Sequence, residues 1–189
     1  MVEVRNVEPV NMKRVTMAQR LDFGTRVNLP LEERTQAMEK STWGAEFSYV
    51  ELERLASAVV VRRLSQGETL FRESDPGDFM AIVVDGMAKI LKEGDDNNDH
   101  LIAEIGAGAC VGEMALVDGG SRSASVIVSK ESTLLVLTVE AFGALGQRDP
   151  RIWGLCLQRF ARTLSARLRR TSEEMVDIIT LTGYESESY

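Results

Sequence analysis

One run of small and apolar residues, VGEMALVDGGSRSASV at 111–126, carries an acid and a base nine positions apart, Glu113 and Arg122. The guanidinium of an arginine matches two phosphate oxygens, and a carboxylate accepts a hydrogen bond from a sugar hydroxyl. The glycines around them, Gly112 and the pair 119–120, let a ligand approach backbone N–H groups. The run therefore predicts a site for a small ligand with one phosphate and one sugar hydroxyl. The alternative is a surface hairpin with a Glu–Arg ion pair worth about 0–1 kcal/mol.

The sequence offers few residues for a metal site or for catalysis. His100 is the only histidine and lies in a polar cluster, GDDNNDH. Zinc and iron sites usually draw on two or three histidines, and a Ser–His–acid set would depend on His100 alone. We therefore expect no metal and no catalysis. Cys110 and Cys156 both lie in apolar runs, which favours buried thiols in a reducing compartment.

Composition places the chain among soluble globular proteins. The 189 residues carry a net charge of −7, with 44% apolar and 27% charged residues. The length suits one domain with additional segments. The negative net charge disfavours a protein that coats nucleic acid without sequence preference. The N-terminus has no apolar signal region, and no run approaches the roughly 18 residues of a membrane span. We expect a cytoplasmic protein without a membrane partner.

The middle of the chain has the pattern of short strands separated by turns. A helix is expected over YVELERLASAV, starting at residue 49. Glycine turns and the SDPGD turn at 74–78 then separate several β-branched runs, which are VVVRRL, TLF, FMAIVVDG, MAKILKEG, HLIAEIG, SVIVS and TLLVLT. Gly86 is expected to turn the chain between the third and fourth runs. This spacing predicts an all-β sandwich or barrel.

Helical segments flank the strands. Residues 1–45 are expected to form a helical or partly ordered arm, with short helices in MKRVTMAQRLDF and LPLEERTQAMEKSTW. Asp149-Pro150 predicts the start of a long helix, with an apolar stripe at Leu157, Phe160, Leu164 and Leu168. Because that helix is long for one domain, we expect it to pair with a second copy in a homodimer. Residues 46–180 then form the main domain, and residues 181–189 a flexible tail.

The order of residues in GEMALVDGGSRSAS closely resembles the phosphate-binding cassette of the cyclic nucleotide-binding domain family, which includes the bacterial catabolite activator protein and kinase regulatory subunits. The family pattern is filled in register by Gly112, Glu113, Met114, Ala115, Leu116, Arg122, Ser123, Ala124 and Ser125. The resemblance extends over residues 46–175. It implies a mainly β fold with flanking helices, a double-stranded β-helix (jelly roll), covered by a long C-terminal lid helix. Ser121 replaces the proline that many relatives have before the arginine.

The resemblance also implies roles for single residues. Arg122 would bind the cyclic phosphate, and Glu113 the ribose 2′-hydroxyl, with Gly112 giving it room. Backbone N–H groups near Met114 and Ala115 would complete the phosphate cradle, with Ala124 part of the same cassette. Ser123 would bind the phosphate or a guanine amino group; the alternative is an ordinary strand serine.

The sequence identifies the residues that would contact the base less clearly than those that would contact the phosphate. Ile90, Ile102 and Ile105 are candidates for an apolar floor beneath the purine, although they suit the core equally well. Counting from the cassette to the lid helix brings Arg167 near the position that covers the base in the catabolite activator protein. A solvated helix face is the alternative for Arg167. Cyclic AMP is favoured as ligand, and cyclic GMP stays open because of Ser123.

Three kinds of regulator remain. The first is a non-catalytic sensor that signals through its C-terminal helix and N-terminal arm to an unknown effector protein. The second is a transcription regulator of the Crp/Fnr type lacking its own helix-turn-helix, because the sequence stops at residue 189; we expect no direct DNA binding. The third is a degenerate domain that serves as a protein-interaction module.

Overall fold

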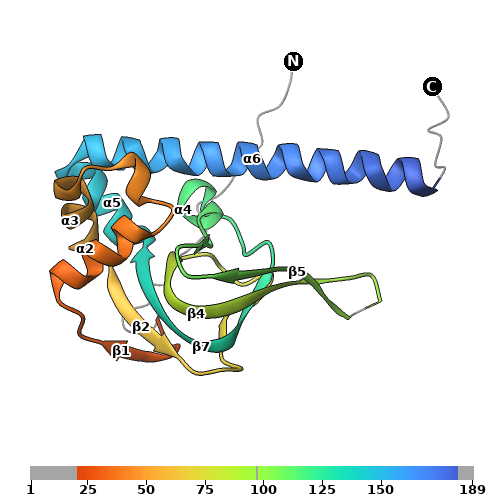
Figure 1. The fold of residues 1–189 in the computed structure, drawn as a ribbon, viewed down its shortest axis with the longest axis horizontal. Coiled ribbons are helices and arrows are strands. Elements are labelled where there is room, and N and C mark those ends of the chain that lie inside the picture. Colours follow the sequence, from red (N-terminus) through yellow and green to blue (C-terminus); the bar gives the residue numbers. More distant parts are fainter. Residues whose placement is uncertain (1–20, 97, 183–189) are drawn as a thin grey trace, which may run out of the picture.

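The computed structural model describes residues 21–96 and 98–182. Its strands form one antiparallel sheet of seven, in the order β1-β2-β7-β4-β5, with β3 paired to β7 and β6 paired to β4. The sheet is strongly curved, and the helices gather at one end and along one side of it (Figure 1). The expected mainly β fold with flanking helices, of the jelly-roll type, is confirmed.

The strands are β1 (Thr25–Val27), β2 (Val60–Leu64), β3 (Thr69–Phe71), β4 (Phe79–Glu93), β5 (Asp99–Gly106), β6 (Cys110–Val111) and β7 (Ser125–Thr138). The helices are α2 (Leu31–Lys40), the 3₁₀ turn η1 (Gly44–Glu46), α3 (Tyr49–Ala56), α4 (Met114–Asp118), α5 (Val139–Arg148) and α6 (Pro150–Thr182). The helices expected in LPLEERTQAMEKSTW and YVELERLASAV are thus present. Most of MKRVTMAQRLDF lies outside the described residues. The short strand β1, within the expected helical arm, was not predicted.

Two strands are longer than the sequence predicts. The runs on either side of Gly86 form the single strand β4, and the last two runs form the single strand β7. Gly86 has φ +98° and lies where the β4–β7 register shifts. A side chain there would meet Ser132 Oγ at 2.2 Å and Glu131 O at 2.3 Å. The glycine therefore lets β4 bend against β7 instead of reversing the chain, and the predicted turn at this position is wrong.

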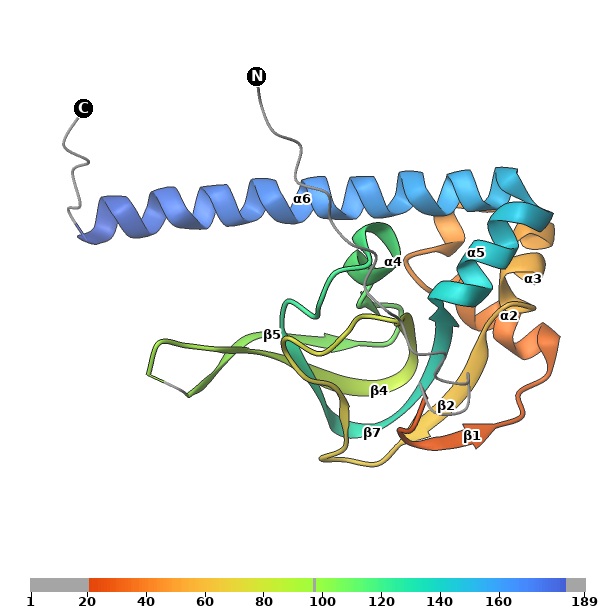
Figure 2. The same cartoon turned by 180° about the vertical axis from the view of Figure 1, so that it is seen from behind.

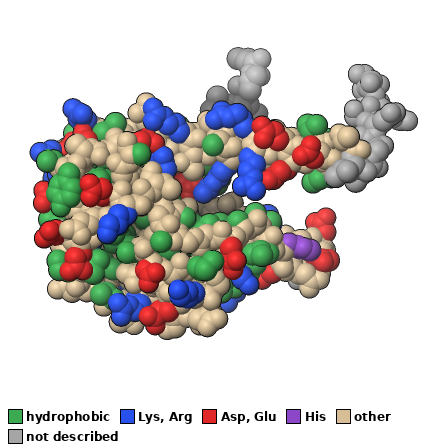
Figure 3. Space-filling view, viewed as in Figure 1, with side chains coloured by type: hydrophobic (Ala, Val, Ile, Leu, Met, Phe, Trp, Pro, Cys, Tyr) green, Lys and Arg blue, Asp and Glu red, His purple; other side chains and the backbone are tan. Residues whose placement is uncertain are grey.

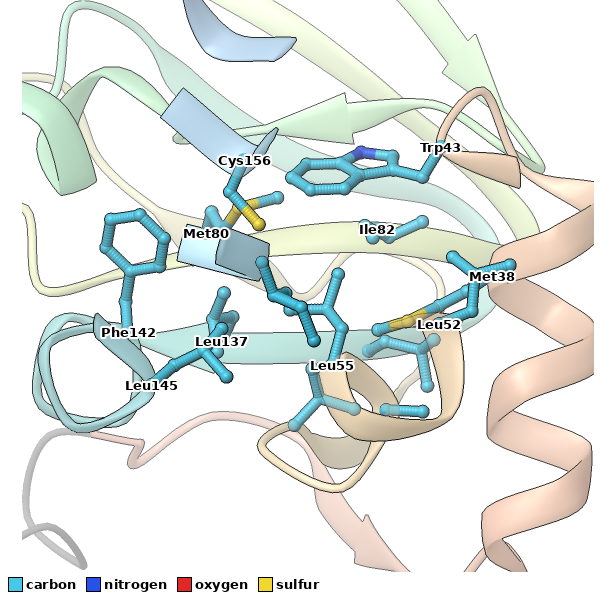
Figure 4. Packing of buried hydrophobic residues seen from close by; sticks show 14 of the residues in the cluster. Met38, Trp43, Leu52, Leu55, Met80, Ile82, Leu137, Phe142, Leu145 and Cys156 are labelled. Carbon is cyan, nitrogen blue, oxygen red and sulfur yellow. The ribbon is translucent and has the colours of Figure 1, made fainter. Parts of the chain in front are cut away.

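The helical end of the molecule packs on the sheet through one apolar core. Trp43, Phe142 and Phe160 form its aromatic centre, with rings 5.5–5.7 Å apart in edge-to-face geometry. Figure 4 shows this layer, in which Cys156 of α6 and Met80 of β4 point toward each other. Glu46 adds ion pairs from η1 to Arg159 and Arg162 of α6. These contacts fix the first part of α6 to the rest of the domain.

Helix α6 begins where Asp149 and Pro150 predict. Asp149 Oδ1 accepts a hydrogen bond from the Ile152 amide at 3.3 Å. The helix passes over α4, runs along the same side as the β4–β5 hairpin and ends beyond its tip (Figures 1 and 2). Its last described side chains, 165–180, are all exposed. The tail expected from residue 181 falls on the end of α6 and, from 183 onward, outside the described residues. In the described part of the chain, no helix has the length and hydropathy needed to cross a membrane.

Candidate functional site

The acid and the base singled out in the sequence lie on one loop–helix–loop segment between β6 and β7. Gly112 follows β6 with φ +76°, and Glu113 precedes the first turn of α4. The chain leaves α4 through Gly119, which has φ +65° and whose amide bonds to Ala115 O. Two left-handed glycines therefore allow the tight path that brings Arg122 back beside Gly112.

The turn at 74–78 holds the backbone of this segment. The Ser74 amide donates to Arg122 O at 2.9 Å, and the Arg122 amide donates to Asp75 O at 2.8 Å. Gly77 donates to Gly120 O at 3.2 Å. A side chain on Gly77 would meet the Ala115 Cβ at 2.2 Å, so only glycine permits the turn to lie this close. The SDPGD turn thus fixes the position from which the Arg122 side chain projects.

The Arg122 side chain is buried but only partly hydrogen-bonded. Nη1 donates to Phe79 O at 2.7 Å and more weakly to Gly112 O at 3.4 Å. Nη2 lies 3.6 Å from Asp78 Oδ1, yet Nη2 and Nε make no hydrogen bond. Burial lowers the pKa of this guanidinium, and the nearby carboxylates Asp78 and Asp75 partly offset that effect. Since arginine stays protonated in proteins, Arg122 is a buried cation whose Nε and Nη2 have no hydrogen-bond acceptor.

Glu113 is fully buried and its carboxylate is held by the lid helix. Arg167 of α6 donates through Nη1 to Glu113 Oε1, and through Nη2 to Cys110 O at 3.5 Å. The Glu113 side chain is 1% exposed and that of Arg167 50%. The thiol of Cys110 is 4.0 Å from Glu113 Oε2, and its pKa is raised well above the usual value by burial first and by the Glu113 charge second. Arg167 therefore joins α6 to the acid that the sequence assigns to a sugar.

A hollow of about 450 Å³, partly open to solvent, joins these groups. Nearly all the predicted site residues line it, namely Gly112, Glu113, Met114, Ala115, Arg122, Ser123, Ala124 and Arg167. Figure 3 shows the molecule hollowed between α6 and the sheet, with basic side chains, all arginines, on the helix above the gap. Ser123 Oγ faces Met114 Sδ at 3.8 Å at the rim.

The apolar wall of the hollow differs from the one expected. Ile102 is 61% exposed on the edge strand β5 and does not line the hollow. Ile105 packs on the barrel core, so only Ile90 of the three candidate isoleucines contributes, together with Phe71, Val111 and Val126. Neighbouring residues of a strand point to opposite faces, and β5 is an edge strand of the sheet among the described residues. The alternation of residues along β5 therefore could not show, from the sequence, which of its side chains face the hollow.

The geometry fits an anion with an adjacent hydroxyl. Nε and Nη2 of Arg122, which have no hydrogen-bond partner, can donate to phosphate oxygens, and the small residues Gly112 and Ala115 line the same hollow. Glu113 can accept from a donor beside that phosphate. The apolar wall formed by Ile90 and Val126 can cover an aromatic base. Among the described residues, no cluster of His, Cys, Asp and Glu could hold a metal ion.

Comparison with known proteins gives a consistent result. Residues 61–149 match the family described as "Cyclic nucleotide-binding domain". Over 122 residues the chain is 33% identical to the cyclic AMP receptor protein of Thermus thermophilus, covering 64% of this chain and 55% of the relative. A CRP-like cAMP-activated global transcriptional regulator of Mycobacterium tuberculosis is 29% identical over 114 residues, or 60% of this chain and 49% of the relative. The chain thus spans about half the length of these curated relatives.

A solved structure extends the likeness beyond the matched segment. The crystal structure of a cyclic nucleotide-binding domain from Methylobacillus flagellatus has a TM-score of 0.69 and 28% identity to this chain. The superposition covers 84% of this chain and 86% of that one, so the helices before and after the sheet are largely included. Residues 61–149, which contain the cassette, therefore belong to the cyclic nucleotide-binding domain family.

Proposed function

We propose that this protein is a non-catalytic sensor of a cyclic nucleotide. The observation that carries the proposal is Arg122, a buried cation whose Nε and Nη2 have no hydrogen-bond partner and which lines the same hollow as Glu113. Arg122 would bind the cyclic phosphate and Glu113 the ribose 2′-hydroxyl. The binding unit would be residues 46–180, and residues 1–45 would carry the output to an effector protein.

Cyclic AMP is the proposed ligand in preference to cyclic GMP. The relatives from Thermus and Mycobacterium are named for cyclic AMP, and the wall beside the phosphate site is apolar at Ile90 and Val126. Ser123 is the polar residue that would favour a guanine, because its exposed hydroxyl lies at the rim of the hollow beside the Met114 sulfur. Ser123→Ala separates the two cases: it should weaken cyclic GMP more than cyclic AMP if this hydroxyl binds the guanine.

Arg167 makes α6 part of the site before any ligand is present. A nucleotide that binds Glu113 must share that carboxylate with Arg167 or displace it. In either case the ligand binds with different affinity to the protein with α6 docked and to the protein with α6 undocked. That difference in affinity determines how far the equilibrium between the two positions of α6 moves. We therefore propose α6 as one route by which occupancy is transmitted.

We further propose that α6 pairs with α6 of a second copy. Its exposed apolar residues include Leu168, Met175 and Ile178, which are 69%, 59% and 60% exposed. They lie on one stripe with alternating spacings of four and three residues, formed by Leu157, Ala161, Leu164, Leu168, Thr171, Met175 and Ile178. Such a stripe is the pattern of a two-stranded coiled coil.

Calorimetric titration with cyclic AMP and cyclic GMP tests the function directly. Arg122→Ala should lose about 2–4 kcal/mol of binding free energy, the scale for removing one partner of a desolvated charge pair. Arg169→Ala removes the same charge from an exposed site on α6 and should leave the affinity unchanged. Equal affinity for the wild type and the Arg122 variant would contradict the assignment of this site.

A second candidate is an interaction module that binds no nucleotide. It is favoured by one observation, that Arg167 already occupies the Glu113 carboxylate. No heat and no thermal shift with either nucleotide, in the wild type and in Arg167→Ala alike, would favour this function over the sensor.

A further inference from the structure

Two aromatic rings hold the guanidinium of Arg122. Its Cζ lies 4.0 Å from the ring centroid of Phe71 and 4.4 Å from that of Phe79. The hydrogen bond to Phe79 O is its shortest polar contact; Nε and Nη2 make no hydrogen bond, although Nη2 lies 3.6 Å from Asp78 Oδ1. The rings therefore set the orientation of the unpaired N–H groups, through cation–π attraction and by excluding other positions.

A third ring, from the N-terminal segment, supports this arrangement. Phe23 stacks on Phe79 with centroids 4.9 Å apart and an interplanar angle of 30°. Phe79 is 3% exposed, so it has little freedom to move once both neighbours are in place. A guanidinium over one face and a stacked ring together confine the Phe79 side chain. Phe23 thus acts on Arg122 through a single intermediate ring.

The segment that carries Phe23 is itself fastened to the sheet. Arg62 of β2 donates to Leu21 O and lies 5.7 Å from the Phe23 centroid. Gly24, with φ +56°, turns the chain directly into β1, and a side chain there would meet Arg63 O at 2.4 Å. Strand β1 then pairs with β2. The position of Phe23 therefore depends on the docking of residues 21–27 at the edge of the sheet.

We propose that Phe23 is a positioning residue for Arg122, and that docking of residues 21–27 is linked to occupancy of the phosphate site. The linkage rests on the proposed function; the positioning does not. Because coupling between two sites is reciprocal, undocking this segment weakens the ligand by the same factor by which the ligand favours docking. The N-terminal segment then has a physical connection to the phosphate-binding cation, independent of α6.

The positioning is measurable in the protein without ligand. The Arg122 Nε–H resonance experiences the ring currents of Phe71 and Phe79, so its chemical shift reports the geometry of the enclosure. Phe23→Leu should change the chemical shift of this resonance, whereas Phe23→Tyr, which keeps the ring, should leave it close to the wild-type value. Phe47→Leu is the matched control. Phe47 also belongs to a stacked pair, with its ring centroid 5.8 Å from that of Trp43, but it lies in the core between the helices and the sheet, away from Arg122. A shift with Phe23→Leu no larger than with Phe47→Leu overturns the proposal.

The linkage is measurable by titration of the full chain with cyclic AMP. Phe23→Leu should weaken binding about three- to tenfold, the scale of one aromatic pair, while Phe23→Tyr and Phe47→Leu stay near the wild type. Hydrogen exchange at residues 25–27 should slow when cyclic AMP is added. Binding by the wild type with no change of affinity in Phe23→Leu overturns the linkage. Absence of binding by the wild type contradicts the proposed function instead, and the Arg122 resonance still decides the positioning.

Discussion

Gly112 is the residue at which the backbone of the cassette, Arg122 and an aromatic ring come closest together. A side chain at Gly112 would meet Arg122 Nη1 at 2.6 Å and the Phe71 ring at 3.3 Å, and its φ is +76°. We expect Gly112→Ala to lower the free energy of unfolding by about 1–3 kcal/mol from backbone strain, with a further loss from the clash. Urea denaturation measures both together.

The contribution of the clash is separated by Gly119→Ala. Gly119 has φ +65°, and nothing lies within 4 Å of a side chain placed there, so this variant carries the strain alone. Gly112→Ala should be the less stable of the two and should also displace the Arg122 guanidinium. Equal unfolding midpoints for both variants would mean that Phe71 and the Arg122 side chain move aside at little cost in free energy.

The cassette could be predicted from the sequence because its residues are adjacent along the chain. Glu113 and Arg122 lie on one short segment, and the order of the residues around them resembles the phosphate-binding cassette of the family. The aromatic enclosure could not be predicted, since Phe23, Phe71 and Phe79 come from three separate segments. In the sequence each of them reads as an ordinary core residue. Arg167 was placed by counting along the chain, and the structure brings it to Glu113 rather than to an identified base contact.

At the scale of elements, two ion pairs connect α3 to the start of α6. Arg54 contacts Asp149 at 2.7 Å, and Arg151 contacts Glu51 at 3.0 Å. The pKa of Asp149 is lowered mainly by its hydrogen bond with Arg54, and that of Glu51 mainly by the Ser48 amide. A carboxyl whose pKa is lower in the folded state stabilises the fold above its unfolded pKa of about 4. That stability is lost as the pH falls through the folded value.

We therefore expect Asp149→Asn to be less stable than the wild type at pH 7, with the difference shrinking as the pH falls below about 4. Urea denaturation of both proteins at pH 7, 5 and 3 measures the trend. Asp85→Asn changes the same charge at an exposed position of β4 and should show no such convergence. A difference for Asp149→Asn that stays constant with pH would show that the charge of Asp149 does not stabilise the fold.

The outer half of α6 gives a second prediction at this scale. If two copies pair along the apolar stripe, Leu168→Glu places a charge in a closed interface and should produce monomers. Light scattering with size-exclusion chromatography measures the mass. Ala166→Glu adds the same charge to the exposed part of the helix but off the stripe, and should leave the dimer intact. A monomeric wild type, or monomers from both variants, would contradict pairing through this stripe.

The long strands show where a local pattern is insufficient. Glycine in a β-rich run usually predicts a turn, but Gly86 accommodates the close approach of residues 131 and 132 on β7. That contact joins positions about 45 residues apart, so it is absent from the local sequence. The start of α6 was predictable for the opposite reason: the cap at Asp149 and the proline that follows it are neighbours.

At the scale of the whole molecule, the two cysteines differ in depth within one core, with Cys156 inside it and Cys110 at its edge. Cys156 is fully buried in the core between the helices and the sheet, and burial raises the pKa of its thiol to about 12. Cys110 lies half-buried at the cassette, where its carbonyl accepts a hydrogen bond from Arg167. Exposure of Cys156 requires disruption of the core, whereas Cys110 lies at the edge of that core, where we expect movement of α6 away from the cassette to be enough to expose it.

We therefore expect a thiol reagent to modify Cys110 faster than Cys156 in the folded protein, because local opening takes less free energy than global unfolding. Arg167→Ala should accelerate modification of Cys110 roughly three- to tenfold, since Arg167, which is half-exposed, contributes about 1 kcal/mol to docking through its ion pair with the buried Glu113. The rate at Cys156 should not change. Mass spectrometry of the modified peptides gives both rates in one experiment. Arg169→Ala serves as the control, and equal acceleration at both cysteines would show that Arg167 stabilises the fold as a whole rather than the docked position of α6.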